Sequence, residues 1–203
     1  METQETLIGT GSSRLFVVNN FTENYFDRLQ KEIGPLLQHE PEIKVYGRVC
    51  NQRRNVGFFS NESVGYMYSG QTMKSQPLDN PLLKDILKRV NKELGTNFNG
   101  ILVNEYINGE KIVGAHSDDE RGLGITKGNR SCVAGICYGA IRKFRVRSKK
   151  DGETGKIVLD HNHQPCSLLV MDGDFQKEFT HEIPQQKRIK DSRISLTFRY
   201  HTK

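Results

Sequence analysis

The sequence predicts an α+β fold that is mainly β: an antiparallel sandwich or jelly roll buttressed by N-terminal helices. After Asn97, short apolar or alternating runs recur between turn signals, a pattern typical of such β folds. Before that point, apolar residues recur at helical spacing from Pro81 onward. The length of 203 residues suits one domain with a sizeable core.

The sequence of the N-terminal region predicts a flexible tail followed by a strand. Residues 1–14, which include Thr10-Gly11-Ser12-Ser13, are expected to form a flexible tail. The apolar run Leu15-Phe16-Val17-Val18 is typical of a strand. We therefore expect one domain that spans residues 15–203.

Two helices are predicted between this strand and the β core. The first has Thr22 as a plausible cap, should end at Gly34-Pro35, and places on one face Phe26, Leu29 and Ile33. The second begins at Pro81, because Asn80 suits the N-cap and proline suits the first turn. Gly95 suits its end, and its apolar stripe comprises Leu82, Leu83, Ile86, Leu87, Val90 and Leu94. This stripe is expected to pack against a sheet.

Six runs after Asn97 predict strands of the β core. Turn signals separate some of them, namely Asn108-Gly109, Asp151-Gly152 and Asp172-Gly173. The runs cover residues 101–106, 131–138, 143–147, 156–159, 167–171 and 193–200.

Composition indicates an intracellular protein, with nucleus and cytoplasm not distinguished. Hydrophobic residues make up 35% of the chain and charged residues 27%, no apolar run approaches the length needed to cross a bilayer, and the N-terminus lacks a secretory signal. We expect no membrane contact and a monomer. The net charge of +6 favours polyanionic partners, of which nucleic acid is the commonest. Without an export signal, we expect reduced thiols at Cys50, Cys132, Cys137 and Cys166.

The tripeptide His116-Ser117-Asp118 is a candidate metal site, with His181 as the third ligand. Residues two apart in a strand point the same way, so His116 and Asp118 could reach one ion. Two histidines and one carboxylate leave three coordination sites open for an oxidant and a bidentate co-substrate, as in non-haem iron(II) oxygenases. The alternative is that residues 118–121 form an exposed charged turn. A second cluster with ligand spacing, His161-Asn162-His163, is interpreted as a solvated loop because Gln164-Pro165 follows it.

The last predicted strand alternates strictly and suggests a site for a dicarboxylate. Ile194, Leu196 and Phe198 face one side, and the opposite side carries Arg193, Ser195, Thr197 and Arg199. On an open sheet that side would be wet, whereas inside a jelly roll it would line the cavity. Two guanidinium groups in a cavity require anions, and arginine grips carboxylates with paired hydrogen bonds. Asn104 and Tyr106 form a second same-face pair of hydrogen-bond donors.

The composite pattern resembles the AlkB family of nucleic-acid demethylases. The order of Asn104-Glu105-Tyr106, His116-Ser117-Asp118, His181 and the segment 193–199 matches that family, and the similarity runs from about Ile43 to Tyr200. The resemblance implies a double-stranded β-helix in which His116, Asp118 and His181 hold Fe(II) and act in catalysis. It also implies that 2-oxoglutarate contacts Asn104, Tyr106, Arg193, Thr197 and Arg199. Ser195 joins this set, although bacterial members are expected to have asparagine there.

The sequence is similar in particular to the eukaryotic branch that repairs double-stranded DNA. Tyr46 stands where that branch wedges an aromatic residue, usually phenylalanine, into the duplex, and residues 66–70 match the segment that stacks on the flipped base. Tyr68 departs from the phenylalanine expected there. The resemblance implies that the substrate-binding residues are Tyr46, Gly47, Arg48, Arg53, Tyr66, Met67, Tyr68, Asp119 and Glu120.

The implied activity is direct reversal of DNA damage: oxidative demethylation of 1-methyladenine and 3-methylcytosine, coupled to conversion of 2-oxoglutarate to succinate and release of formaldehyde. Its cofactors would be Fe(II), 2-oxoglutarate and molecular oxygen, and its partner double-stranded DNA with a flipped alkylated base. Phosphate contacts are expected from Arg53-Arg54 and from a basic stripe formed by Lys143, Arg145, Arg147 and Lys149; a solvated strand face is the alternative for the stripe.

Three alternatives remain at this stage. The same chemistry could act on RNA or on a protein side chain. A jelly roll without activity could serve as a nucleic-acid-binding module, although the retained metal ligands argue against it. A structural zinc site is the least favoured, because the ligand set lacks cysteine and is widely spread.

Overall fold

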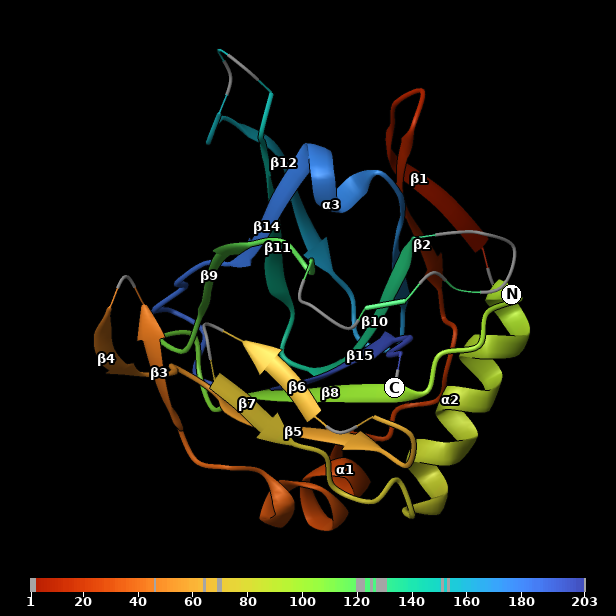
Figure 1. Cartoon of the computed structure of the whole chain (residues 1–203), viewed down its shortest axis with the longest axis vertical. Coiled ribbons are helices and arrows are strands. Elements are labelled where there is room, and N and C mark those ends of the chain that lie inside the picture. Colours follow the sequence, from red (N-terminus) through yellow and green to blue (C-terminus); the bar gives the residue numbers. More distant parts are fainter. Residues whose placement is uncertain are drawn as a thin grey trace.

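The computed structural model describes residues 3–45, 47–63, 65–68, 71–119, 123–124, 126, 131–150, 152 and 154–202. Two antiparallel sheets face each other and form the predicted jelly roll (Figure 1). The larger sheet contains, in spatial order, β1 (Thr3–Gly9), β2 (Ser13–Asn19), β13 (Leu168–Gly173), β10 (Cys132–Gly139), β15 (Arg193–Arg199), β8 (Gly100–Tyr106) and β5 (Asn55–Ser60). The smaller sheet contains β12 (Ile157–His163), β11 (Arg142–Ser148), β14 (Phe179–Ile183) and β9 (Val113–His116).

Two further strand pairs lie beside the jelly roll (Figure 1). One consists of β3 (Glu42–Val45) and β4 (Arg48–Asn51), and the other of β6 (Gly65–Tyr68) and β7 (Gln71–Lys74). Both pairs are antiparallel and stand outside the two main sheets.

The larger sheet separates two apolar layers, because alternate residues of a strand point to opposite faces. Its outer face packs under the helices and includes Phe16, Val18, Ile136, Ile194, Leu196 and Phe198. Its inner face packs toward the smaller sheet, where the cluster includes Leu15, Val17, Leu169, Met171, Phe144 and Val146. The predicted division of the last strand is therefore confirmed: its three apolar residues face the helices, and its polar residues face the interior.

Helix α2 (Pro81–Leu94) forms as predicted, packed against the outer face of the larger sheet. The Asn80 side chain accepts a hydrogen bond of 3.1 Å from the Leu83 amide, which caps the helix. Gly95 ends it in the left-handed region with φ of 63°, where a residue with Cβ would be strained. Five apolar positions of the stripe are buried: Leu82, Leu83, Ile86, Leu87 and Val90.

Helix α1 (Phe26–Glu32) starts later than Thr22, so the predicted cap is wrong. The Thr22 hydroxyl lies 3.0 Å from the hydroxyl of Tyr138 instead, tying the chain to β10. The helix ends before Gly34-Pro35, as predicted, and a 3-10 turn (Gly34–Leu36) follows it. The other described α-helix is the short α3 (Phe175–Glu178).

The prediction of a flexible tail is wrong for residues 3–9, because these residues form β1 and pair with β2. The hydroxyl groups of Thr10, Ser12 and Ser13 all donate to the Glu178 carboxylate, which fixes the turn between the two strands. Side chains of β1 are largely exposed. An edge strand held by backbone hydrogen bonds needs no apolar face, and its sequence therefore lacks a strand signal.

The six predicted runs all form strands, but β12 is longer than expected. It continues through His163, so His161-Asn162-His163 is not a solvated loop. Pairing with β11 extends it, since Arg142 lies opposite His163 and Lys143 opposite Asn162. The four cysteines are free. Among the described helices, none is long and apolar enough to span a lipid bilayer.

Candidate metal centre and co-substrate pocket

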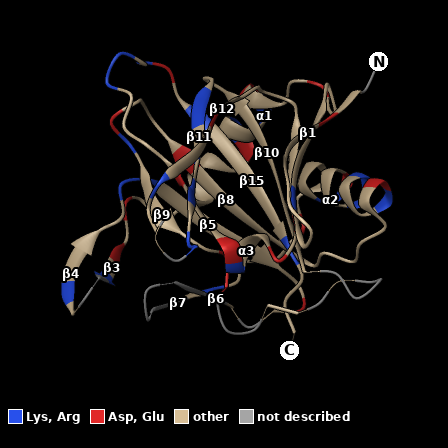
Figure 2. Cartoon of the chain, turned by 90° about the horizontal axis from the view of Figure 1, so that it is seen from above, with Lys and Arg blue, Asp and Glu red and all other residues tan. Residues whose placement is uncertain are grey.

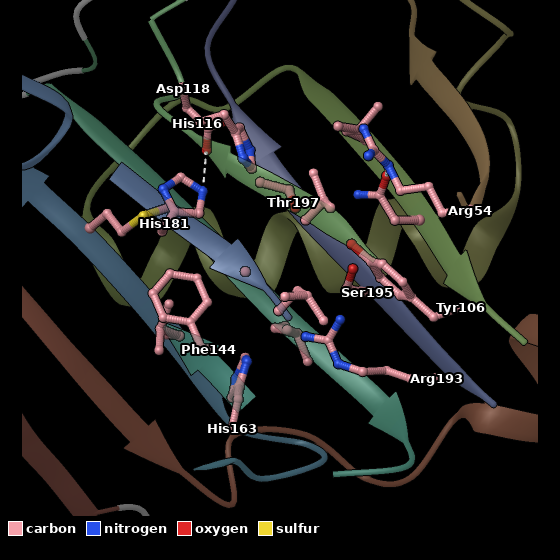
Figure 3. Close-up of a pocket in the computed structure, with 18 of the residues that line it drawn as sticks. Arg54, Tyr106, His116, Asp118, Phe144, His163, His181, Arg193, Ser195 and Thr197 are labelled. Carbon is pink, nitrogen blue, oxygen red and sulfur yellow. Dashed lines mark hydrogen bonds and ion pairs between the residues drawn. The ribbon is translucent and has the colours of Figure 1, made fainter. Parts of the chain in front are cut away.

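The three predicted metal ligands meet at one end of a pocket between the two sheets (Figure 3). His116 ends β9 and His181 lies in β14, directly opposite it in the register, with ring centroids 4.4 Å apart. The Nε2 atom of each histidine lies 3.6 Å from one carboxylate oxygen of Asp118. All three ligand atoms lie within 4.8 Å of one another, close enough to share one ion.

Asp118 reaches this position from a bend rather than from a strand, which corrects the expected geometry. Strand β9 ends at His116, so the two ligands do not share a strand face. The Asp118 amide donates to Oε1 of Gln176 over 2.9 Å, and its Oδ1 accepts a 2.5 Å hydrogen bond from Nη2 of Arg199. The Ser117 hydroxyl donates to the carbonyl of Phe179. Tertiary contacts thus orient the carboxylate.

The protonation state of the three ligands suits a metal ion. Nδ1 of His116 lies 2.8 Å from the Gly114 carbonyl, which can only accept, so Nδ1 carries the proton and Nε2 is available. Burial, and then the neighbouring His116, lowers the pKa of His181 to about 3. Burial also lowers the pKa of His116. Burial opposes ionisation of Asp118, but Arg199 and the two histidines outweigh it and lower its pKa. The site therefore offers two neutral imidazoles and one carboxylate.

The predicted co-substrate residues line the same pocket as the triad: Asn104, Tyr106, Arg193, Ser195, Thr197 and Arg199. The antiparallel register of β8 and β15 brings them together. Arg193 lies opposite Tyr106 and Ser195 opposite Asn104. Side chains at opposed positions share a face, so one strand pair supplies most of the polar lining.

Arg193 is a buried cation in this pocket whose guanidinium needs further hydrogen-bond acceptors. Its side chain is 3% exposed, and its Nε and Nη1 atoms have no hydrogen-bond partner among the described residues. The Tyr106 ring lies 5.5 Å from its guanidinium carbon. A buried guanidinium without an anion is costly, and a carboxylate of a bound 2-oxo diacid would supply the missing acceptors. The pocket thus fits both a facial-triad metal ion and a dicarboxylate.

Three further residues of this site were not expected from the sequence. Arg54, expected at phosphates, is buried in the pocket and donates from Nε to Oδ1 of Asn104 over 2.7 Å. The local sequence contains no sign of this burial, because Gln52, Arg54 and Val56 alternate in burial with their neighbours but not in polarity. His163 lines the pocket, whereas it was expected in solvent. No local signal identifies Gln176, because its contact with Asp118 is purely tertiary.

The predicted substrate residues lie outside this pocket or outside the described residues. Gly47, with φ of 77°, and the exposed Arg48 lie at the turn between β3 and β4. Arg53 is exposed and donates to the Glu110 carbonyl, and Asp119 is exposed directly after the triad. Tyr46 and Glu120 are not described, and of Tyr66, Met67 and Tyr68 only the backbone of β6 is described.

Acidic residues of the flanking strands form ion pairs with three of the four side chains of the basic stripe, which corrects the argument that the stripe needs a polyanion. Asp160 on β12 accepts from Arg145 at 2.7 and 2.9 Å and from Lys143 at 2.8 Å. Glu182 on β14 accepts from Arg147 at 2.9 and 3.1 Å. Lys149 donates to the Gln176 carbonyl. Basic and acidic positions are interspersed over the molecule (Figure 2).

A family model matches most of the chain. The model described as the 2OG-Fe(II) oxygenase superfamily matches residues 16–199. The chain belongs to this superfamily. The matched region contains the triad and the whole of β15.

The chain is similar in sequence to curated proteins that are named as demethylases or dioxygenases. The chain is 33% identical over 201 aligned residues to "DNA oxidative demethylase ALKBH2" of Arabidopsis thaliana, covering 86% of this chain and 60% of that protein. It is 29% identical to the protein of the same name in Bos taurus, over 87% of this chain and 63% of the relative. The human "Alpha-ketoglutarate-dependent dioxygenase alkB homolog 3" is 34% identical over 66% of this chain and 47% of its own length. The chain thus spans about 60% of the length of the first two relatives.

Solved structures of 2OG-Fe(II)-type enzymes share the fold of this superfamily member. "The structure of OsALKBH1" aligns with a TM-score of 0.58 and 14% identity, over 97% of this chain and all of that one. A prolyl hydroxylase from Trichoplax adhaerens, in complex with a peptide fragment, aligns with a TM-score of 0.57 and 11% identity, over 92% of this chain and 83% of the other. These likenesses support the jelly-roll assignment.

Proposed function

We propose that this superfamily member is a DNA oxidative demethylase that repairs 1-methyladenine and 3-methylcytosine. The observation that carries the proposal is the pocket in which a His-Asp-His triad shares the lining with a buried arginine, Arg193, whose Nε and Nη1 atoms have no hydrogen-bond partner among the described residues. The names of the curated relatives, DNA oxidative demethylase among them, support DNA as the substrate. We further infer that residues 15–203 form one catalytic domain and that the protein acts as a monomer.

In this proposal His116, Asp118 and His181 hold iron(II) and are the catalytic ligands. Bound iron(II), with 2-oxoglutarate and oxygen, supplies the oxidation of the N-methyl group to hydroxymethyl, yielding succinate and carbon dioxide; the hydroxymethyl group then leaves as formaldehyde. Arg193 holds the distal carboxylate of 2-oxoglutarate. The polar side chains of Asn104, Tyr106, Ser195 and Thr197 line the rest of that site.

Arg199 is also proposed to contact 2-oxoglutarate, because it lines the same pocket. Its Nη2 atom donates to Asp118, which keeps that carboxylate ionised and oriented. Arg54 orients Asn104 by donating a hydrogen bond to its Oδ1 atom. Both arginines are buried, so they also exclude water from the reacting groups.

The DNA-binding part of the proposal rests on the strand pairs beside the pocket. The exposed β4 residues Arg48 and Val49 follow Gly47 at the turn between β3 and β4, and Tyr46 precedes Gly47 in the sequence. We propose that this turn enters a duplex where the damaged base leaves the stack, that Arg53 contacts the backbone, and that Tyr66, Met67 and Tyr68 stack on the base. Asp119 and Glu120 would attract the cationic lesion. A base unable to pair is the least costly to flip.

A demethylation assay tests the function. Purified protein is incubated with iron(II), ascorbate, 2-oxoglutarate and an oligonucleotide carrying 1-methyladenine, as single strand and as duplex. Methyl loss that depends on 2-oxoglutarate is expected, and the His116→Ala variant should show none. Turnover of 2-oxoglutarate without methyl loss would reject the substrate and retain the chemistry. If the iron-loaded protein shows neither 2-oxoglutarate turnover nor methyl loss, the alternative of an inactive nucleic-acid-binding module is favoured.

Strand preference is tested separately with Tyr46→Ala. If Tyr46 enters the duplex, activity on duplex should fall much more than activity on a single strand. Equal losses on both would reject this role. Parallel assays with methylated RNA distinguish the RNA alternative.

A further inference from the structure

His163 is a buried imidazole inside the pocket that the demethylation chemistry leaves without a role. It is the last residue of β12, opposite Arg142 on β11, and its side chain is 2% exposed. Figure 3 shows its ring next to Arg193, at the end of the pocket remote from the triad. This is the end where the distal carboxylate of a bound 2-oxo diacid would lie.

The hydrogen bonding of His163 defines its tautomer. Nε2 lies 3.1 Å from the carbonyl oxygen of Ser167, which can only accept, so Nε2 carries the proton. The backbone is held as well, because the Cys137 thiol donates to the His163 and Gln164 carbonyls. In the neutral ring, Nδ1 is then a bare acceptor.

The ring is neutral throughout the range in which the protein would work. Burial first, and then the positive charge of Arg193, lowers the pKa of His163 to about 3. A protonated imidazole beside the guanidinium is thereby excluded, and Nδ1 keeps its lone pair.

Arg193 has the complementary requirement. The guanidinium carries five N–H donors, and Nε and Nη1 have no partner within the described part of the chain. A carboxylate can take two of these donors as a bidentate pair, and the orientation of the planar group decides whether it can do so. A neutral acceptor beside the guanidinium would fix that orientation. Because it carries no negative charge, it would not replace the carboxylate as the counter-ion of the guanidinium.

We propose that His163 is a positioning residue that orients the Arg193 guanidinium to receive the distal carboxylate of 2-oxoglutarate. The inference rests on the proposed function, because it requires that Arg193 binds that carboxylate. It concerns co-substrate affinity and leaves the metal site unchanged.

Binding measured by calorimetry with Zn(II) in place of iron tests the proposal without any turnover. His163→Leu keeps a similar volume and removes the acceptor, so 2-oxoglutarate should bind about tenfold more weakly, as expected for loss of a hydrogen bond to a charged group. His163→Asn retains an acceptor and should lose less. The matched control is His161→Leu, which makes the same substitution on the same strand at a residue that does not line the pocket. This variant should bind 2-oxoglutarate with the affinity of the wild type.

A second ligand separates positioning from packing. 2-Oxobutanoate has the same 2-oxo acid end but lacks the distal carboxylate, so His163→Leu should not weaken its binding. Equal weakening of both ligands, or equal losses for the Leu and Asn variants, would overturn the proposal. If wild-type protein binds Zn(II) but not 2-oxoglutarate, the proposed function itself fails. Normal 2-oxoglutarate binding by His163→Leu refutes the role of His163 alone.

The wild-type protein offers an independent measurement should the variants fail to fold. Nitrogen-15 NMR of the six histidines should reveal one neutral imidazole, protonated at Nε2, whose Nδ1 signal shifts when 2-oxoglutarate is added and not when 2-oxobutanoate is added. A spectrum in which no unprotonated Nδ1 responds in this way would also overturn the proposal.

Discussion

Arg199 donates a 2.5 Å hydrogen bond from Nη2 to Oδ1 of Asp118, and the side chains of both residues are 2% exposed. The pair joins β15, which supplies the polar face of the pocket, to the bend that supplies the metal-binding carboxylate. It keeps Asp118 charged in a place where burial alone would favour the protonated acid. The metal site is therefore prepared before any ion binds.

The first prediction follows from this pair. Arg199→Met leaves the Asp118 carboxylate buried without its main cation, so the metal-free protein should lose about 3–5 kcal/mol of unfolding free energy. Urea unfolding measures the loss with and without saturating Mn(II). The deficit should shrink when the ion is present, because the ion also neutralises the carboxylate. Arg28→Met, which removes an exposed pair with Glu32, is the control and should cost less than about 1 kcal/mol. Identical deficits with and without Mn(II) would contradict the interpretation.

The second prediction concerns metal affinity. Removing residues around metal ligands typically costs 10–100-fold in affinity, so deleting a ligand outright by His181→Ala should cost at least about a hundredfold. Calorimetric titration with Mn(II) measures it. His161→Ala changes a histidine outside the triad and should bind the ion normally. Retained affinity in His181→Ala would mean that the ion binds elsewhere.

The third prediction concerns Arg142, which is buried and clasps two loops. Its guanidinium donates to the carbonyls of Asn108, Lys111 and Pro184, each at 2.9 Å. Arg142→Met should destabilise the protein by about 3 kcal/mol or more, because several buried acceptors lose their donors. Hydrogen exchange should accelerate at the Gly109 and Gln186 amides, which link the same loops. Arg147→Met, on the same strand but paired at the surface, should leave these amides protected; acceleration in both variants would argue against the clasp.

The fourth prediction is a pH dependence from Asp160. Hydrogen bonding to Arg145, and also to Lys143, lowers the pKa of Asp160 to about 2 from an ordinary value of 3.8. The folded state therefore favours the carboxylate, and this stabilisation is complete above pH 4 and disappears as the pH falls toward 2. Asp160→Asn should lower the unfolding free energy by about 1 kcal/mol at neutral pH, given how weak surface ion pairs are. The difference from wild type should vanish near pH 2 in urea unfolding series; a difference constant across this range would count against the ion pair.

Local residue types and periodicity sufficed for the parts of the molecule that depend on neighbours along the chain. Helix α2 follows from Asn80, Pro81 and Gly95, which satisfy the helix ends locally. The two faces of β15 follow from strict alternation, because side chains of a strand project with a period of two. The triad residues could be named because their order, together with Asn104, Tyr106 and the segment 193–199, matches a family pattern; His116-Ser117-Asp118 by itself left an exposed charged turn as the alternative.

The tertiary structure decided everything that depends on which strands lie side by side. Asp160 and Glu182 form ion pairs with the basic stripe because their strands, β12 and β14, flank β11, and the stripe's own sequence contains no sign of these partners. Pairing with β11 likewise drew His163 into the pocket. Gln176 and Arg199 orient Asp118 from distant parts of the chain. Sequence alone determined the chemistry that each residue offers, whereas cross-strand register, a non-local property, determined which of these groups face one another.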